Sequence, residues 1–145
     1  MILLDTNVVS EPLRLAGNAA VLAWIDAQNV ETLYLAAISL AELRYGVAVL
    51  PPGKRKDTLH QNLERRVVPL FAGRILPFDE AAADAYATLR AHARTIGKAI
   101  STADGYIAAT AAARGMTVAT RDTSPFEAAA LTLINPWDFV CSKTE

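Results

Sequence analysis

Short apolar runs recur along the chain and alternate with segments of helical periodicity. The first run, Ile2-Leu3-Leu4, has no polar interruption, which is typical of a strand buried on both faces of a sheet. Further strands are predicted at 32–36, 74–78, 116–120 and 131–134. Because strands that alternate with helices form parallel sheets covered on both faces, the pattern predicts an α/β fold. We expect three layers, α/β/α, around a mostly parallel central sheet.

Two neighbouring helices are predicted in the middle of the chain. The first runs from about Ser39 to the breaker Pro51-Pro52-Gly53, and its apolar positions are Leu40, Leu43, Val47 and Leu50. The second is more charged, and its apolar stripe consists of Leu59, Leu63, Val67 and Leu70. We therefore expect a helical hairpin, at about residues 39–70, that projects from the domain.

Capping residues mark the starts of the other helices. Asn18, Asp79 and Ser101 each precede a helical segment, and Gly97 is positioned to end the helix that Asp79 begins. The segment Ser124-Pro125-Phe126-Glu127 is typical of a capping box with proline at the first helical position.

Composition adds limits to this picture. At 145 residues the chain is most simply a single domain, residues 1–145, with a short C-terminal tail from about 138. The apolar fraction of 52% and the charged fraction of 20% fit a compact globule. A net charge of −1 excludes a global basic field for nucleic acid. Basic residues still cluster at Lys54-Arg55-Lys56 and Arg65-Arg66, where they fit a solvated helix face as well as a nucleic-acid rim.

The single cysteine and the absence of targeting signals bear on location. Cys141 cannot form a disulfide framework or a cysteine zinc cluster within one chain. The N-terminus lacks the basic region and cleavage site of a secretory peptide, and no window is apolar for long enough to span a bilayer. We expect a soluble cytoplasmic protein without membrane contact.

Four acids stand at equivalent places in the predicted sheet. Asp5, Glu42, Asp104 and Asp122 each lie at the end of a strand or in the first turn of the helix after one. In a parallel sheet these positions share one edge, where α/β folds place their ligands. The sequence therefore predicts that the four carboxylates converge.

Local roles compete with that interpretation for three of the acids. Asp5 suits an Asx turn, and Glu42 is the last residue of the capping-box pattern Ser39-Leu40-Ala41-Glu42. Asp104 also fits a capping box with Ser101, but it heads a helical face that consists of Ile107, Ala108 and Ala111. Asp122 has no such role, because the helix after it is predicted to have its own cap, Ser124.

Carboxylates that converge repel one another unless a cation lies between them. A site with only oxygen ligands and no His or Cys nearby suits Mg²⁺ or Mn²⁺ better than zinc. Such ions activate a bound water and neutralise charge on a phosphodiester during in-line displacement.

The order of four motifs resembles that of the PIN-domain ribonucleases. The motifs are Ile-Leu-Leu-Asp-Thr-Asn at 2–7, Ser-Leu-Ala-Glu-Leu at 39–43, Ala-Asp-Gly-Tyr-Ile-Ala-Ala-Thr-Ala at 103–111 and Ala-Thr-Arg-Asp at 119–122. Within that family the chain is similar to the VapC toxins of toxin–antitoxin pairs, and most specifically to their FitB-like branch. The segment 70–79 and the closing Ile-Asn-Pro-Trp at 134–137 point to that branch.

The resemblance implies a toxin that hydrolyses RNA phosphodiester bonds with Mg²⁺ or Mn²⁺ as cofactor. Asp5, Glu42, Asp104 and Asp122 match the family's acidic quartet, which implies metal-binding and catalytic roles for all four. Many relatives carry Asn where this chain has Asp122, so the fourth position departs from the usual pattern. Thr6 and Thr120 match hydroxyls that often line such sites.

The resemblance also implies partners besides the RNA substrate. A cognate antitoxin, of the DNA-binding ribbon-helix-helix type, would insert a peptide into the toxin's groove and inhibit it. The predicted hairpin is similar to the region that grips the antitoxin, and operator DNA would be bound only through the antitoxin. A homodimer is usual in the family, and the alanine-rich face from Ala81 to Ala93 suits close packing against another subunit.

Two other functions remain open from the sequence. A phosphotransferase with Asp5 as nucleophile would need a second acid two residues on, where this chain has Asn7, and a lysine, for which Lys98 has no supporting motif. A DNA-regulatory module that acts with a partner and has little nuclease activity of its own is the main alternative. His60 and His92 each stand alone, without the spacing of a metal site or a triad.

Overall fold

The computed structural model describes residues 1–140, so Cys141 and the end of the predicted tail lie outside the described residues. The strands are β1 (Ile2–Leu4), β2 (Leu33–Ala36), β3 (Ile75–Leu76), β4 (Thr117–Ala119) and β5 (Leu133–Ile134). The helices are α1 (Thr6–Ser10), α2 (Ala19–Ala27), α3 (Ala37–Ala48), α4 (Lys54–Asn62), α5 (Glu80–Thr95), α6 (Thr102–Ala113) and α7 (Ser124–Glu127). Each strand is at the place that its apolar run predicts; β1 spans its whole run, and the other strands are shorter than predicted.

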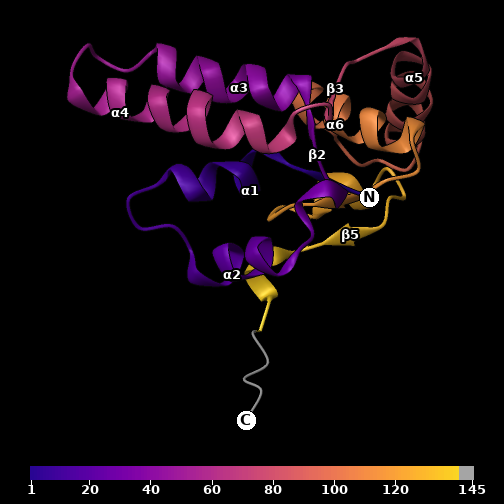
Figure 1. Cartoon of the computed structure of the whole chain (residues 1–145). Coiled ribbons are helices and arrows are strands. Elements are labelled where there is room, and N and C mark those ends of the chain that lie inside the picture. Colours follow the sequence, from indigo (N-terminus) through magenta and orange to yellow (C-terminus); the bar gives the residue numbers. More distant parts are fainter. Residues whose placement is uncertain (141–145) are drawn as a thin grey trace.

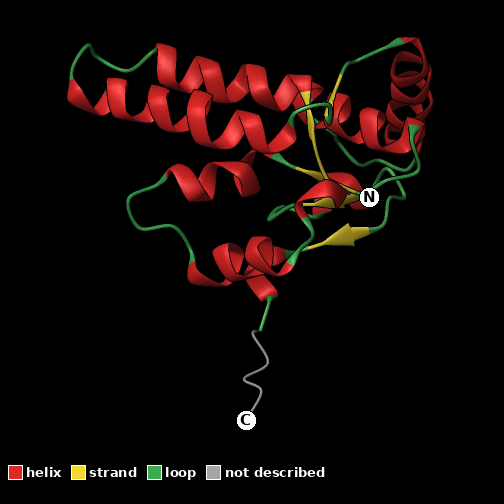
Figure 2. Ribbon diagram, viewed as in Figure 1, coloured by secondary structure: helices red, strands yellow, loops and turns green. Residues whose placement is uncertain are grey.

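The strands form one parallel sheet in the order β3-β2-β1-β4-β5. β1 lies at the centre, where Ile2 is opposite Leu33 on one side and Thr117 on the other. Figure 2 shows the strands running through the middle of the molecule with helices around them. Because every neighbour is parallel, the carboxyl ends of all strands meet at one edge.

Two hydrophobic clusters cover the two faces of the sheet. Consecutive residues of a strand point to opposite faces, so Leu4 and Ala119 join one cluster while Leu3 and Val118 join the other. The first cluster is completed by α1, α2, α3 and the segment after α4, and the second by α5, α6 and α7. The three-layer α/β/α fold that the sequence predicts is confirmed.

The helical hairpin is also confirmed, and in Figure 1 it extends to the left of the sheet above α1. Arg44 on α3 holds the other arm through two hydrogen bonds from its guanidinium to Glu64, at 2.9 and 3.1 Å. The second arm is less regular than predicted. After α4 it continues as a π-turn, Leu63–Val67, and a 3₁₀ turn, Val68–Phe71.

That irregularity corrects the predicted apolar stripe. Leu63 and Val67 are buried as expected, but the Leu70 side chain is 52% exposed. The π-turn shifts the helical register, and Pro69 has no N–H group to continue the α-helix. Leu70 therefore rotates away from the core, and Phe71 takes the buried place.

Three predicted caps are confirmed and two are wrong. The side chains of Asn18, Asp79 and Ser101 accept hydrogen bonds from backbone N–H groups in the first turns of α2, α5 and α6. Ser39 is not a cap: α3 begins two residues earlier, directly after β2, so Ser39 is inside the helix and fully buried. Ser124 is not a cap either, because the backbone of Thr123 is already helical and takes the cap position without a side-chain bond.

Within residues 1–140, no helix is both long enough and apolar enough to pass through a lipid bilayer.

Candidate active site

Asp5 stands where the central strand ends. Its backbone N–H extends the ladder by donating to the carbonyl of Ala119 at 2.9 Å. Its side chain turns back to cap α1, with Oδ1 accepting from the N–H of Thr6 at 2.8 Å. Only 5% of the residue is exposed, so this carboxylate is buried at the carboxyl edge of the sheet and does not lie on the surface.

Thr120 holds the other oxygen of Asp5. The buried Thr120 hydroxyl donates to Asp5 Oδ2 at 2.8 Å and lies 3.4 Å from the backbone oxygen of Asp122. The N–H of Thr120 donates to Ile134 and so ties this position to β5. Both oxygens of Asp5 are therefore fixed, one by each flanking strand-end threonine.

Glu42 approaches from the hairpin. It lies on the exposed side of α3, and its Oε1 accepts a hydrogen bond from the Thr6 hydroxyl at 3.2 Å. This contact replaces the capping role that Ser39-Leu40-Ala41-Glu42 suggests, because Ser39 is not at the start of the helix. Thr6 thus connects the end of β1 to the first turns of α3.

Asp104 approaches from the opposite side, on the first turn of α6. Ser101 accepts from its backbone N–H at 3.2 Å, so the capping bond fixes the main chain and leaves the carboxylate available. The side chain is half-buried at the head of a face formed by buried Ile107, Ala108 and Ala111. The helical face that the sequence predicts is therefore present, with an acid at its sheet-edge end.

Electrostatic effects connect three of these acids. Burial raises the pKa of the Asp5 carboxyl from 3.8 to about 6, and the hydrogen bonds from Thr120 and Thr6 oppose that rise. The negative charges of Asp104 and Glu42 raise the same pKa further. The charges of Asp104 and Glu42 therefore act on Asp5 at the carboxyl edge of the sheet.

Asp122 interacts less strongly with Asp5 than Asp104 and Glu42 do. It lies exposed in the loop after β4, and it is not among the charges that shift the pKa of Asp5. Its backbone oxygen, not its carboxylate, faces Thr120. As the side chains are placed in residues 1–140, no three acidic, imidazole or thiol groups stand close enough to hold one metal ion. The structure thus gathers Asp5, Asp104 and Glu42 loosely and leaves Asp122 at the rim.

Asn7 and Arg121 also lie at this edge, and the sequence did not predict the contacts that they make. Asn7 Oδ1 accepts from the backbone N–H of Arg121 at 3.4 Å, which links the start of α1 to the loop after β4. The Arg121 guanidinium lies 5.3 Å from the centre of the Trp137 ring. The available signal was their position, since Asn7 and Arg121 are next to the strand-end residues Thr6 and Thr120.

Comparison with known proteins identifies the class. A family model of the PIN domain matches residues 2–131, and the chain belongs to this family. It is 59% identical over 137 residues to the toxin FitB of Neisseria gonorrhoeae (strain ATCC 700825 / FA 1090), covering 94% of this chain and 99% of the relative. It is 61% identical over 138 residues to the VapC ribonuclease Y4jK of Sinorhizobium fredii (strain NBRC 101917 / NGR234), covering 95% and 99%.

A solved structure agrees with these relatives. FitAB bound to an IR36 DNA fragment contains a chain that is 56% identical and superposes with a TM-score of 0.93, covering 98% of this chain and 99% of that one. The predicted resemblance to VapC-type toxins of the FitB-like branch is therefore confirmed, as is the fold.

Proposed function

We propose that this chain is the toxin of a toxin–antitoxin pair and a divalent-metal-dependent ribonuclease that hydrolyses RNA phosphodiester bonds. The observation that carries the proposal is the buried carboxylate of Asp5, oriented by Thr6 and Thr120 and facing the charges of Asp104 and Glu42. Relatives named a toxin and a ribonuclease, at about 60% identity along nearly the whole chain, support the same assignment.

The residues of the site fit Mg²⁺ or Mn²⁺. All of the candidate donors are carboxylate oxygens, which these hard cations prefer. Ionising a buried Asp5 beside two further acids is unfavourable, and a bound cation removes that penalty. When bound, the ion supplies an activated water and neutralises charge on the phosphodiester. In the proposal Asp5 and Asp104 are the principal ligands, and Glu42 and Asp122 complete the site directly or through water.

The chain's own groups prepare the site. Thr120 and Thr6 each fix one oxygen of Asp5, so the carboxylate presents a single orientation to a ligand. The Thr6 hydroxyl also orients Glu42, which α3 holds at the opening of the site. Such partners of metal-binding groups set ligand orientation and basicity.

We infer that a cognate antitoxin of the ribbon-helix-helix type inhibits the toxin and binds operator DNA on behalf of the pair. The DNA-bound FitAB structure supports a two-component complex of this kind. Homodimer formation belongs to the same proposal. The alanine face of α5 contributes less to a dimer than its sequence suggests, because Ala82 and Ala93 are already buried inside the chain.

We further propose that the chain works as one domain. Both hydrophobic clusters combine residues from the two halves of the sequence: Leu4 packs with Ala119, and Leu3 with Val118.

Substitution of the principal ligands tests the enzyme. We expect Asp5→Asn and Asp104→Asn each to remove RNA cleavage and growth inhibition while circular dichroism remains that of the wild type. Asp26→Asn, which neutralises an exposed acid at the end of α2, is the matched control and should cleave normally. Chelation of divalent ions should stop wild-type cleavage, and Mg²⁺ or Mn²⁺ should restore it. Cleavage at the wild-type rate by either site variant would contradict the assignment.

The alternative of a DNA-regulatory module predicts different behaviour. It requires that the purified pair shift operator DNA while the chain alone leaves RNA intact at every metal concentration. Gel-shift and cleavage assays on the same preparations separate the two functions.

A further inference from the structure

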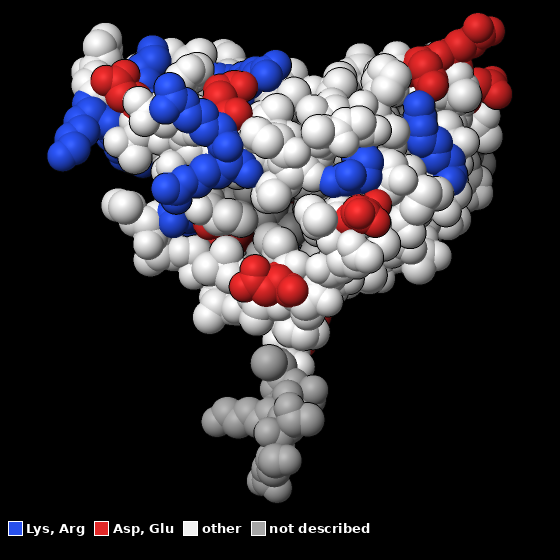
Figure 3. Space-filling view, in the orientation of Figure 1, with Lys and Arg blue, Asp and Glu red and all other residues white. Residues whose placement is uncertain are grey.

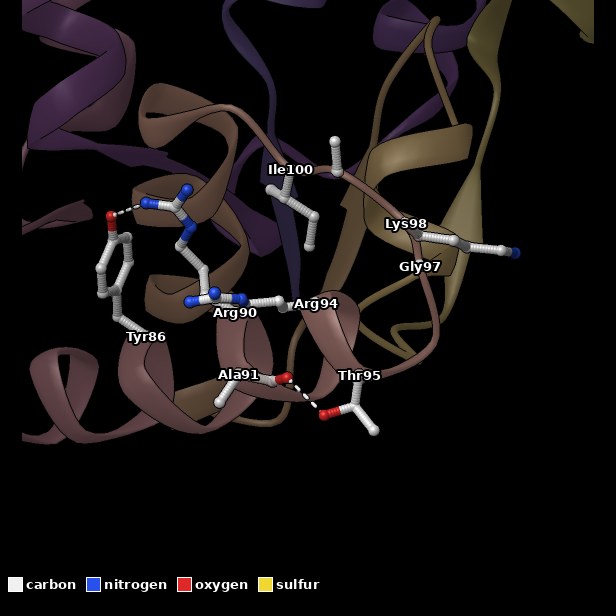
Figure 4. A pocket seen from close by; sticks show the side chains of 9 residues that line it. Tyr86, Arg90, Ala91, Arg94, Thr95, Gly97, Lys98 and Ile100 are labelled. Atoms are coloured by element: carbon white, nitrogen blue, oxygen red, sulfur yellow. Dashed lines mark hydrogen bonds between the residues drawn. The ribbon is translucent and has the colours of Figure 1, made fainter.

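A second feature of the surface lies beside the acids, at the end of α5. A hollow of about 780 Å³ opens there, between the last turns of α5 and the connection to α6. Its lining includes Tyr86, Arg90, Arg94, Lys98 and Ile100, and Figure 4 shows these residues from close by. We call it the α5 hollow.

The hollow is a built feature of the backbone. Gly97, with φ of 73°, ends α5 in the left-handed region, and its N–H donates to the carbonyl of Arg94 at 3.1 Å. The N–H of Lys98 donates to Ala93 at 2.9 Å, which completes a Schellman motif. Ile100 then anchors the returning chain, since only 5% of it is exposed. The wall of the hollow is therefore held in place at both ends.

The positive charges that line the α5 hollow are not balanced by acidic side chains. Arg90, Arg94 and Lys98 repeat every fourth residue, and no acidic residue lines the hollow. Among the described residues none of the three forms an ion pair, although Arg14, Arg44 and Arg114 each pair with a carboxylate. In a chain with a net charge of −1, neighbouring cations without an acidic partner favour an anionic ligand.

Neutral aromatic side chains orient Arg90. Arg90 Nη1 donates to the Tyr86 hydroxyl at 2.6 Å, and its guanidinium carbon lies 5.4 Å from the centre of that ring. Tyr86 is itself stacked on Tyr106 of α6, with ring centres 4.9 Å apart. Figure 4 shows the side chains of Arg90 and Arg94 extending to the same side, whereas Lys98 points the other way. Tyr86 thus holds the Arg90 guanidinium in a fixed direction.

The hollow adjoins the acidic site through Gly105, the residue after Asp104. A Cβ atom at Gly105 would lie 3.0 Å from Cε2 of Tyr86 and 3.3 Å from Cδ of Arg90. Tyr86 and Arg90 therefore pack directly on the turn of α6 that carries Asp104.

We propose that the α5 hollow binds the phosphate backbone of the RNA substrate beside the scissile bond. This inference rests on the proposed ribonuclease function and adds the surface that holds the substrate. The acids of the site repel a polyanion, so binding needs cations nearby that are not already paired. Guanidinium groups bind phosphate oxygens in a fork, and Tyr86 offers an aromatic edge next to them. Arg90 and Arg94 contact the phosphates directly in this scheme.

Salt-dependent binding tests the proposal. The probe is a labelled single-stranded RNA of mixed sequence, and the full-length chain carries Asp5→Asn so that the probe stays intact. Each phosphate contact on a single strand adds about 0.7 to the slope of log K against log salt. Arg90→Gln with Arg94→Gln should lower that slope by about 1.4. Arg90→Lys with Arg94→Lys keeps both charges and should retain the wild-type slope, which separates lost charge from lost packing.

A matched pair of substitutions tests the location. Thr95 lines the hollow and Thr88 does not, yet both are exposed threonines of α5 whose hydroxyls donate to the carbonyl four residues earlier. Thr95→Arg should tighten RNA binding and raise the slope by about 0.7, whereas Thr88→Arg, with the same added charge, should not.

Each outcome has a definite meaning. An unchanged slope in the double glutamine variant, or equal effects of Thr95→Arg and Thr88→Arg, would overturn the proposal for the hollow. If the wild type still cleaved RNA in that case, the ribonuclease assignment would stand. A change in sedimentation without a change in RNA affinity would show that the hollow is an interface between copies of the chain. If the wild type neither bound nor cleaved RNA, the proposed function would fail as well.

Discussion

The side chains of Asp5 and Thr120 are 115 positions apart in the sequence and are joined by a hydrogen bond of 2.8 Å at the carboxyl edge of the sheet. β1 and β4 are parallel neighbours in register, so the residues that follow them are brought side by side. This bond orients the most deeply buried acid of the site. Several measurable consequences follow from it and from the packing around it.

Asp5→Asn should stabilise the fold at neutral pH in the absence of divalent ions. The pKa of Asp5 is about 6 in the folded chain and near 3.8 when exposed, so between these values the folded state holds a proton that the unfolded state loses. Stability therefore falls as pH rises through this window, by about 3 kcal/mol at pH 7. Asparagine removes the penalty, can still accept from Thr6 and can donate to Thr120. Thermal unfolding should show a gain for the variant at pH 7 that disappears near pH 4.

Adding Mn²⁺ should stabilise the wild type, which carries the Asp5 charge, and not the Asp5→Asn variant. The cation should raise the melting temperature of the wild type at pH 7 and leave Asp5→Asn almost unchanged, because the variant lacks the charge that the ion compensates. Equal stabilisation of both proteins would mean that the ion binds elsewhere.

Thr120→Val should lower RNA cleavage by about 10- to 100-fold, the usual cost of removing a partner of a metal ligand. The valine keeps the shape of the side chain but leaves Asp5 Oδ2 without its donor, which also raises the pKa of Asp5 further. Thr120→Ser retains the hydroxyl and should recover most of the rate. Kinetics with saturating Mg²⁺ compare the three proteins, and a Val variant as active as the wild type would remove Thr120 from the site.

Gly105→Ala should destabilise the chain by about 1–3 kcal/mol, because the added methyl group overpacks the contact of α6 with Tyr86 and Arg90. Gly46→Ala is the control. It lies inside α3 with no atom within 4 Å of an added Cβ, so higher helix propensity should stabilise the chain by about 1 kcal/mol. Urea unfolding measures both. Opposite signs are expected, and the same sign for both would contradict the packing argument.

Ser39→Ala and Ser101→Ala should separate a buried serine from a true cap. Ser101 accepts the N–H of Asp104, so its loss should cost about 1 kcal/mol. The Ser39 hydroxyl is buried without a hydrogen-bond partner in the described part of the chain, so alanine there should be neutral or stabilising. Denaturant midpoints of the two variants test this directly, and a loss at Ser39 equal to that at Ser101 would restore the capping interpretation.

The sequence by itself determined the order of the elements, most of their ends and the class of the fold. Apolar runs locate the strands, and Asn18, Asp79, Ser101 and Gly97 mark helix ends correctly, because caps and left-handed turns depend on only a few neighbouring residues. The spacing of apolar residues likewise predicts that Asp5 follows β1 and that Asp104 heads a buried helical face.

Tertiary structure decided what depends on distant partners. The sequences around Ser39 and Ser124 are typical of helix caps, but neither residue is one. α3 begins two residues before Ser39, directly after β2, and the backbone of Thr123 is already helical before Ser124. Asp104 and Glu42 follow Asp5 by 99 and 37 positions in the sequence, and Glu42 reaches the site through Thr6 rather than through Ser39. The spacing of Arg90, Arg94 and Lys98 was visible in the sequence. Only the tertiary structure shows that, among the described residues, none of them forms an ion pair and that Arg90 packs on the turn of α6 that carries Asp104. Local sequence does not specify contacts between segments far apart along the chain.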